Sequence, residues 1–446
     1  MKPYFKYVAL SLAFSQTIAT GHAALKQTDS LHNIPLTLRQ VWDRAAAYSK
    51  AVQIKELHQQ GSIEQIKDAK AERLPELSIE GEYARITNMP VYNNGIFHSP
   101  SQFEVLHSTH TVGADAYFNL YNGNKTNIEI AERKTENNIA VEQKKLTVAE
   151  VKLRAAAYYL DMQRSIIFRD LLLKDIEAQE KQLKQINTLK ANGVVLKSDV
   201  LRAELKLSKQ KLSLVQLNND LAIANQKLNI LIGLPDEQRV EPTKNSEQDS
   251  IALKSNNDYL ADAGVNAYQL KISEQETLLR ELQLKNVRAN VSPKIGLFGM
   301  YKYSYPQIFL YPYSPYLYGI GMGGIKASFS ISSFYHNSHK AKVAKLEYES
   351  QEIEHSQSQD NVRQQVNEAY RRFNEALNRV EVSKVNIKQA LENRRIVSNT
   401  YFNQTSLITD LLDADTQLLQ TRFDLAAAQI AAQLQYYQLQ YITGKL

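Results

Sequence analysis

Histidines and carboxylates are the side chains of this 446-residue chain that could do chemistry, but they lack the spacing of known catalytic motifs. His107/His110 and His336/His339 are each three positions apart. Both pairs fall near expected strand or loop boundaries rather than on one helix face suited to a metal ion, so we expect exposed histidines. The sequence contains no Gly-x-Ser-x-Gly, His-Glu-x-x-His or phosphate-loop motif. We therefore predict no catalytic residue, no metal site, no cofactor and no enzymatic activity.

Aspartates recur at two corresponding places where a helix is expected to begin. Asp199 and Asp410 each follow a hydroxyl residue, and such side chains accept hydrogen bonds from free backbone N–H groups. This predicts N-cap roles for both. Asp413 lies three residues after Asp410, so these two carboxylates share one helix face, one turn apart. We expect Asp415 to be a solvated charge.

Charge and cysteine content narrow the possible functions. The chain has 53 Lys and Arg against 47 Asp and Glu, which gives a formal net charge of +6. This is a slight bias over a mixed surface, without a dense basic run interleaved with aromatics, so we expect no nucleic-acid partner. The absence of cysteine excludes disulfides, thiolate metal sites and a lipid-anchored N-terminal cysteine.

The first 23 residues predict a cleaved secretory signal. Lys2 and Lys6 give a positive start, 8–18 is a short apolar core, and 21–23 places small residues at the cleavage positions. The apolar run is far shorter than the roughly 20 residues of a membrane-spanning helix. No later segment is a candidate for such a helix, so we expect any membrane crossing to be made by β-strands.

Glycine and proline positions divide the chain into long helices and two short inserts. The 119 residues between positions 324 and 444 contain neither residue, and the 69 residues between positions 123 and 193 contain neither. Most of the remaining breakers fall in 75–123 and 293–324. Because glycine and proline disfavour helix interiors, this spacing predicts long helices that alternate with breaker-rich inserts.

The chain is predicted to be a duplication. The stretches 191–204 and 402–415 place Asn, Asp and Ala at matching positions, with an offset near 211 that is too long for a solenoid unit. We predict a first structural repeat at 24–235, a linker at 236–261 and a second repeat at 262–446. The predicted elements, in chain order, are a β-hairpin at 76–121 and a helical tip near 191–199, then a β-hairpin at 293–332 and a helical tip near 402–410.

Apolar spacing within the helices predicts coiled-coil packing. The segments 36–74 and 199–232 are each about half as long as 124–192, so placed end to end they match one long helix. The long segment has 3/4 apolar spacing, with polar lapses that include Gln179. The helix after the first tip has two stripes, one through Leu201, Leu205, Leu212 and Val215, the other through Leu214, Leu217, Leu221 and Leu228. Two seams are typical of a closed wall of helices. An ordinary antiparallel bundle is the alternative that the seams do not exclude.

The inserts alternate between apolar and polar residues with the period of strands. Leu77, Ile79 and Tyr83 face one way in the first insert, and each strand is about ten residues long, enough to cross a bilayer when tilted. The apolar phase changes at Gly323–Gly324, which predicts a β-bulge there. Tyrosines of a membrane-interface belt are expected at Tyr83, Tyr301, Tyr303, Tyr305, Tyr311, Tyr313, Tyr316 and Tyr318.

Four strands cannot close a barrel, and an open sheet edge in lipid leaves backbone groups unpaired. A membrane location therefore requires an oligomer, because about eight strands are needed before a barrel can be filled or hollow. The alternative is a soluble sheet with one buried face.

At this level of detail the sequence resembles the TolC-like outer-membrane efflux channels. The resemblance is carried by helix–Pro–strand junctions at Pro75 and Pro293, the strand exit 118–123, the tip 192–199 with its copy 410–414, and the Gly233-Leu234-Pro235 helix end. It covers nearly the whole mature chain. Two departures are Gln404 in place of Gly193, which leads us to expect a different turn at the second tip, and a strand exit after Phe329 without glycine.

The resemblance implies a mainly α fold with membrane β-hairpins. A duplicated α-helical barrel of long coiled-coil helices would extend into the periplasm, with 236–261 at its equatorial domain. Four strands per chain would contribute to the twelve-stranded β-barrel of a homotrimer in the outer membrane of a Gram-negative-type cell. The function implied is the passive exit duct of a tripartite efflux or type I secretion system, joined by a periplasmic adaptor to an inner-membrane pump. A periplasmic or surface coiled-coil structural or adaptor protein without a pore is the alternative.

The resemblance also implies site residues. Asp410 and Asp413 match the aspartate rings of the family's closed periplasmic entrance, which favour cations. For Asp410, helix capping is the alternative to a role in the entrance. The two tips are expected to receive an adaptor's helical hairpin, or else to pack within the protein. The candidate tip contacts are Gly193, Val194, Val195, Asp199 and Leu407.

Overall fold

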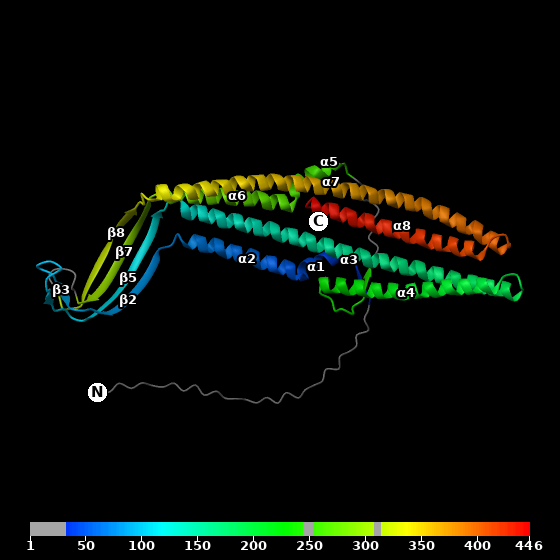
Figure 1. Cartoon of the computed structure of the whole chain (residues 1–446), viewed down its shortest axis with the longest axis horizontal. Helices are drawn as coiled ribbons and strands as arrows, with labels where there is room; N and C mark the ends of the chain where they lie inside the picture. Colours follow the sequence, from blue (N-terminus) through cyan, green and yellow to red (C-terminus); the bar gives the residue numbers. More distant parts are fainter. Residues whose placement is uncertain (1–32, 244–253, 307–313) are drawn as a thin grey trace, which may run out of the picture.

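The computed structural model describes residues 33–243, 254–306 and 314–446. The expected signal peptide with its cleavage site, and the belt residues Tyr311 and Tyr313, lie outside the described residues. The molecule is elongated, with a curved sheet at one end and long helices running away from it (Figure 1). Within the described residues, no helix combines the length and apolar character needed to cross a membrane.

Helices form the greater part of the structure, because long stretches of the sequence contain no helix breaker. The two longest are α3 (Lys125–Ala191) and α7 (Ser333–Phe402), of 67 and 70 residues. At about 1.5 Å per residue each is on the order of 100 Å long. The others are α1 (Leu38–Tyr48), α2 (Lys50–Ala71), α4 (Lys197–Ile232), α5 (Asn256–Asn266), α6 (Tyr268–Arg288) and α8 (Ile408–Ile442).

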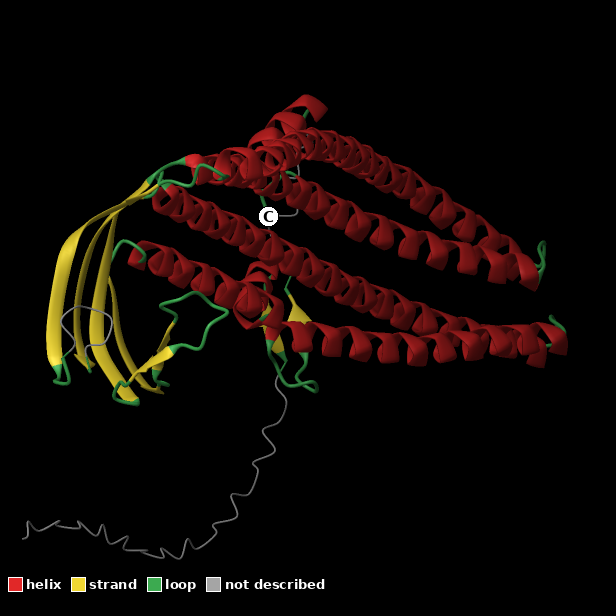
Figure 2. Ribbon diagram, turned by 60° about the vertical axis from the view of Figure 1, so that its left-hand side comes forward, coloured by secondary structure: helices red, strands yellow, loops and turns green. Residues whose placement is uncertain are grey.

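Short helices lie end to end alongside each long one. Helices α2 and α4 follow one another along α3, and α6 and α8 follow one another along α7 (Figures 1 and 2). This confirms the predicted match of two short helices with one long helix. The two halves meet where α3 packs against α6 and α8, so the helices form a layer with α2 and α4 on one margin and α7 on the other.

The largest apolar core lies midway along this layer. It joins α1, α3, α4 and α8 around side chains such as Val41, Tyr159 and Leu228, which are almost fully buried. A short parallel pair, β1 (Ile34–Leu36) and β6 (Val240–Pro242), covers it. The Tyr159 hydroxyl lies 3.0 Å from the carbonyl oxygens of Leu36 and Thr243, so a buried polar group ties this pair to the long helix.

The sheet at the end of the molecule has four antiparallel strands in the order β2-β5-β7-β8. Their bounds are Glu76–Arg85, Ser108–Tyr121, Lys294–Tyr305 and Tyr318–Ser328. Strands β3 (Met89–Val91) and β4 (Ser101–Phe103) form a small ribbon between β2 and β5, and η2 (Ala289–Val291) precedes β7. In the part of the chain that the structure describes, β2 and β8 are the open edges of the main sheet.

The two faces of this sheet differ in chemistry. Cross-strand pairing places Leu77 and Ile79 beside Ala116 and Ala114, and Tyr301 follows in the same row, so one face is apolar and aromatic. The other face carries Glu80, Asp115, Lys302 and Lys326, and the Lys302 ammonium lies 3.9 Å from the Asp115 carboxylate. The predicted alternation is therefore present in β2 and β5, whereas β8 also places Ile320 and Met322 on the face of Lys302.

The bulge expected at Gly323–Gly324 is wrong. The β7–β8 pairing runs without a shift from Lys294↔Ser328 to Ser304↔Tyr318. In β8, glycines occupy positions on the face that carries the tyrosines of β7, so the larger apolar residues of β8 change face along the strand. The Tyr301 and Tyr303 rings of β7 lie over Gly319 and Gly321. Rings from the neighbouring strand fill that face. The residue types along β8 therefore change, while its pairing register with β7 does not. The irregularity in this sheet lies instead between Asn119 and Tyr121, in the β5–β7 pairing.

Candidate functional site

The two helical tips, at the end of the molecule away from the sheet, have the same turn (Figure 1). Gly193 and Gln404 occupy equivalent positions with left-handed φ values of +73° and +63°. Each turn is closed by the N–H of the third residue after the helix, from Val194 to the Leu189 carbonyl at 2.9 Å and from Thr405 to the Thr400 carbonyl at 2.8 Å. The expectation of a different second turn is wrong, because the closing bonds hold glutamine in the conformation that glycine adopts freely.

The likeness between the two tips continues into the helices that follow. Helices α4 and α8 begin at Lys197 and Ile408, so Asp199 and Asp410 are third helical residues rather than N-caps. Their carboxylates nevertheless reach back to free backbone donors, accepting the N–H of Leu196 at 3.3 Å and of Leu407 at 3.1 Å. The predicted capping exists, but from another position than expected. Leucine offers no acceptor in return, so each arrangement is half of a capping box.

The candidate gate residues lie on one side of the start of α8. Asp410 and Asp413 are both exposed, whereas Ile408 and Leu411 on the other side of the helix are buried in a tip core. That core joins the first hairpin, through residues such as Val200, to the second. The site carboxylates therefore project away from the packed side of the tip.

The candidate adaptor contacts divide by exposure. Gly193, Val194 and Leu407 are exposed, and Asp199 is half-buried beneath its capping bond. Val195 packs against the tip core, so its intraprotein role is present. Leu196 is exposed at the position equivalent to Leu407 and was missed from the sequence, although the duplication pairs the two.

Asp415 is the residue that sequence reasoning placed wrongly. It is 3% exposed rather than solvated. Its carboxylate accepts hydrogen bonds from the Nε2 atoms of Gln179 and Gln182, both at 3.0 Å, and from Arg394 Nε at 2.9 Å. Burial in this position follows from α3 and α7 packing on either side of α8. The available signal was the polar lapse at Gln179, because a polar side chain in an apolar seam needs a polar partner.

A lysine from a fourth helix completes this buried cluster. Lys206 Nζ on α4 lies 3.8 Å from the Asp415 carboxylate and donates to the Leu412 carbonyl at 2.6 Å. Burial lowers the pKa of Lys206, and the nearby Asp415 charge opposes this change. On the neighbouring turns, Asp175 accepts a hydrogen bond from Gln210, and burial raises the pKa of Asp175. Four helices thus meet around a cluster of ionisable and amide side chains.

The histidines are exposed, as predicted. His107 directly precedes β5 and His110 lies at its start, near the small ribbon, and the His110 ring stacks on Tyr305 with centroids 4.8 Å apart. His336 and His339 lie at the start of α7. Over residues 33–243, 254–306 and 314–446, no group of three or more His, Cys, Asp or Glu could hold a metal ion.

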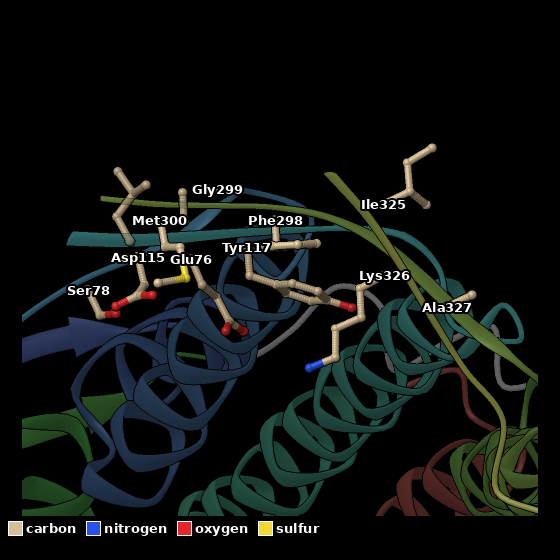
Figure 3. A pocket seen from close by; sticks show the side chains of 12 residues that line it. Glu76, Ser78, Asp115, Tyr117, Phe298, Gly299, Met300, Ile325, Lys326 and Ala327 are labelled. Carbon is tan, nitrogen blue, oxygen red and sulfur yellow. The ribbon is translucent and has the colours of Figure 1, made fainter. Parts of the chain in front are cut away.

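The polar face of the sheet borders a hollow of about 860 Å³. In Figure 3, Asp115, Tyr117 and Lys326 point to one side of the sheet, while Ile325 and Ala327 point to the other. Among the tyrosines expected in a belt, Tyr83, Tyr301, Tyr303 and Tyr305 lie on the apolar face. Tyr318 pairs with Ser304 on the polar face, and the exposed Tyr316 precedes β8.

Part of the chain is similar to a known protein family. Residues 41–234 match the family model described as outer membrane efflux protein. This match lies within the first predicted repeat of the chain. It spans α1 to α4 with β2 and β5, so the efflux-protein match covers the first hairpin and first tip described above. The resemblance predicted from the sequence is thereby confirmed.

The whole fold is similar to that of solved outer-membrane proteins and channels. The outer membrane protein VceC from Vibrio cholerae has a TM-score of 0.74 at 14% identity, over 91% of this chain and 96% of that one. A membrane protein from Pseudomonas aeruginosa has a TM-score of 0.76 at 14% identity, over 98% and 97%. The open-state MtrE outer membrane channel of Neisseria gonorrhoeae has a TM-score of 0.71 at 16% identity, over 91% of this chain and 88% of that one. A comparison with curated proteins finds no match.

Proposed function

We propose that this chain is one protomer of a passive outer-membrane export channel, the exit duct of a tripartite efflux or type I secretion system. One observation carries the proposal: the four-stranded sheet exposes its apolar face and has two open edges. The efflux-protein match and the fold of the solved channels support it.

Lipid accounts for the exposed apolar face. Leu77 is 79% exposed, Ile79 is 84% exposed and Ile325 is 71% exposed, all on the same face. A contiguous apolar surface of this kind is costly in water, whereas strands with one apolar and one polar face suit a membrane barrel. Strands β2, β7 and β8 have 10 to 12 residues, enough for a tilted crossing. Tyr83, Tyr301, Tyr303 and Tyr305 would mark the membrane–water interface.

Further copies of the chain would close the open edges. In lipid, unpaired edge groups of β2 and β8 would each cost several kcal/mol, so β8 of one copy would pair with β2 of the next. The two edges are different surfaces, and such head-to-tail contacts form rings. Three copies, as the family resemblance implies, would give a twelve-stranded barrel of a homotrimer, and the polar face with Glu80, Asp115 and Lys302 would line a water-filled passage.

The helical layer presents the same incompleteness. On one margin, α4 exposes the first of its two predicted stripes, while the second stripe packs inward. On the other margin, α7 exposes a comparable set of apolar residues. The exposed residues are Leu201, Leu205, Leu212 and Val215 on α4, and Val382, Val385, Leu391 and Ile396 on α7. Coiled-coil contact between α4 of one copy and α7 of the next would bury both sets and close a periplasmic tunnel.

The duplicated organisation fits this wall. Repeats at 24–235 and 262–446 would each supply two strands and one long helical hairpin, with the linker 236–261 at an equatorial domain. The cleaved signal would export the chain, and the mature protein would reside in the outer membrane of a Gram-negative-type cell and extend into the periplasm.

The tips would form the controlled entrance. In a trimer, the exposed Asp410 and Asp413 would give two rings of three carboxylates that attract cations. Gly193, Val194, Asp199 and Leu407 would contact the helical hairpin of a periplasmic adaptor, with Val195 supporting the surface from below. Through the adaptor an inner-membrane pump would supply the work, because the channel itself performs no chemistry.

Single-channel recording tests this function. The full mature chain, purified in detergent and added to a planar bilayer, is expected to give stepwise conductance. Asp413→Asn is expected to weaken cation preference and cation block, because three carboxylates leave the entrance. A matched control is Asp424→Asn, an exposed aspartate on the same helix but three turns away. A protein that extracts without detergent as a monomer and gives no conductance would instead support a coiled-coil structural or adaptor protein.

A further inference from the structure

The buried Asp415 lies across α8 from the candidate gate carboxylates. Successive residues of an α-helix are about 100° apart around its axis, so Asp415 is about 140° from Asp410 and about 160° from Asp413. The burial pattern agrees, since Asp415 shares the packed side of α8 with Leu411, whereas Asp410 and Asp413 are exposed. Any rotation of α8 that moves Asp415 therefore redirects both gate carboxylates.

Directional bonds fix Asp415 from several sides. Gln179 and Gln182 on α3 occupy one oxygen, Oδ2, and Arg394 on α7 donates to the other, Oδ1. Lys206 on α4 adds a second tether, because its ammonium binds the Leu412 carbonyl within the same turns of α8. The helix is thus held by polar contacts from three neighbouring helices.

Apolar packing alone would not define this rotation. Leucine and alanine contacts are non-directional, so a helix in such a seam can turn by small angles at modest cost. A helix held by a buried carboxylate resists such a turn, because losing the partners leaves an uncompensated charge, which costs about 3–5 kcal/mol. Buried polar groups are attested as devices that specify register rather than add net stability.

We propose that Asp415 is a positioning residue that sets the rotation of α8 and so aims Asp410 and Asp413 at the entrance. The inference rests on the proposed channel function. It assigns no contact between Asp415 and the transported substance.

The test measures block of the channel by La³⁺ applied from the periplasmic side. Wild-type protein is expected to be blocked through Asp410 and Asp413, and the double variant Asp410→Asn/Asp413→Asn should lose that block. Asp415→Asn keeps both gate carboxylates but loses the charge that holds Arg394 and Lys206. We expect its half-blocking La³⁺ concentration to rise by about tenfold, because three misdirected carboxylates no longer converge on one ion.

Asp175→Asn is the matched control. Asp175 is also a buried carboxylate with a glutamine partner near the tip, but its bond joins α3 to α4 and does not hold α8. This variant should keep the wild-type La³⁺ block. Adding Asp415→Asn to the double gate variant should cause no further change in block, which a general loosening of the structure would not reproduce.

Several outcomes would overturn the inference. One is a conducting Asp415→Asn trimer with wild-type La³⁺ block. If Asp415→Asn does not assemble, Gln182→Leu removes one amide donor and leaves the ion pair with Arg394, and wild-type block in that variant would also reject the inference. Wild-type protein without any conductance would reject the proposed function itself, so the two failures are distinguishable.

Discussion

Acidic side chains near the tips illustrate how burial assigns different roles to one residue type. Asp410 and Asp413 are exposed on α8, whereas Asp415 on the same helix and Asp175 on α3 are buried among polar partners. An exposed carboxylate is accessible to ions in solution. A buried one is costly to ionise unless paired, so it fixes the helices that supply its partners.

The pKa of Asp175 predicts a pH dependence of stability. Burial raises this pKa in the folded protein, while the hydrogen bond from Gln210 and the positive charge of Lys206 oppose the rise. The unfolded value is about 3.9, so the folded state holds the proton to higher pH and stability falls as pH rises between the two values. Above the pKa of the folded state, the whole of this loss in stability remains. Asp175→Asn removes it, so we expect the variant to gain stability relative to wild type as pH rises above about 4.

Thermal unfolding midpoints between pH 4 and pH 8 measure this difference. Asp170→Asn, at an exposed position on the same helix, is the control. Wild-type and Asp175→Asn curves that run parallel over the whole range would contradict the assignment of Asp175 as a group with a raised pKa.

The sequence revealed part of the tip chemistry at the residue scale. Asp199 and Asp410 were found as equivalents because the duplication aligns them, and both do cap a helix start. Asp415 was misplaced because its burial depends on Gln179, Lys206 and Arg394, which come from three helices distant in sequence. Charge and periodicity along α8 alone contain no record of those neighbours.

At the scale of elements, the two tip turns provide a matched pair within one chain. Gly193 and Gln404 have the same left-handed conformation and equivalent closing bonds. For a residue with a Cβ this conformation costs roughly 1–2 kcal/mol, part of which glycine gives back as greater freedom in the unfolded chain. The second tip therefore has backbone strain that the first does not.

Gln404→Gly is expected to stabilise the protein by about 0.5–1 kcal/mol, seen as a higher midpoint of thermal unfolding. Gly193→Gln is the reciprocal change and should cost a similar amount. Open space surrounds Gly193, so its substitution tests the backbone conformation without a steric clash. A lower midpoint for Gln404→Gly would show that the glutamine side chain has a stabilising role.

Element boundaries could be predicted from breakers, but not all their details. The long helices α3 and α7 follow from stretches without glycine or proline, and strand alternation gave the two faces of β2 and β5 correctly, but it did not predict that Ile320 and Met322 of β8 lie on the polar face. The bulge expected at Gly323–Gly324 was wrong because periodicity counted only side chains within β8. The rings that fill the glycine positions belong to β7, and one strand alone cannot show them.

At the scale of the whole molecule, the described part of the chain has unpaired margins in both the sheet and the helical layer. The sheet ends in the open edges β2 and β8, and the helical layer ends in apolar margins on α4 and α7. Both kinds of margin occur at the same two sides, which a head-to-tail ring of identical copies would satisfy together. The sequence predicted the need for partners from strand number. It could not fix the number of copies from physics alone, because closure depends on strand register between chains.

The mass of the assembly in detergent tests this account most directly. Native mass spectrometry of the full mature chain, released from detergent micelles, is expected to show a complex of three protomers and little free monomer. Exposing the apolar sheet face to water should cause aggregation when detergent is removed. A single protomer that remains dispersed in detergent-free buffer would contradict the claim that each chain holds one third of a membrane wall.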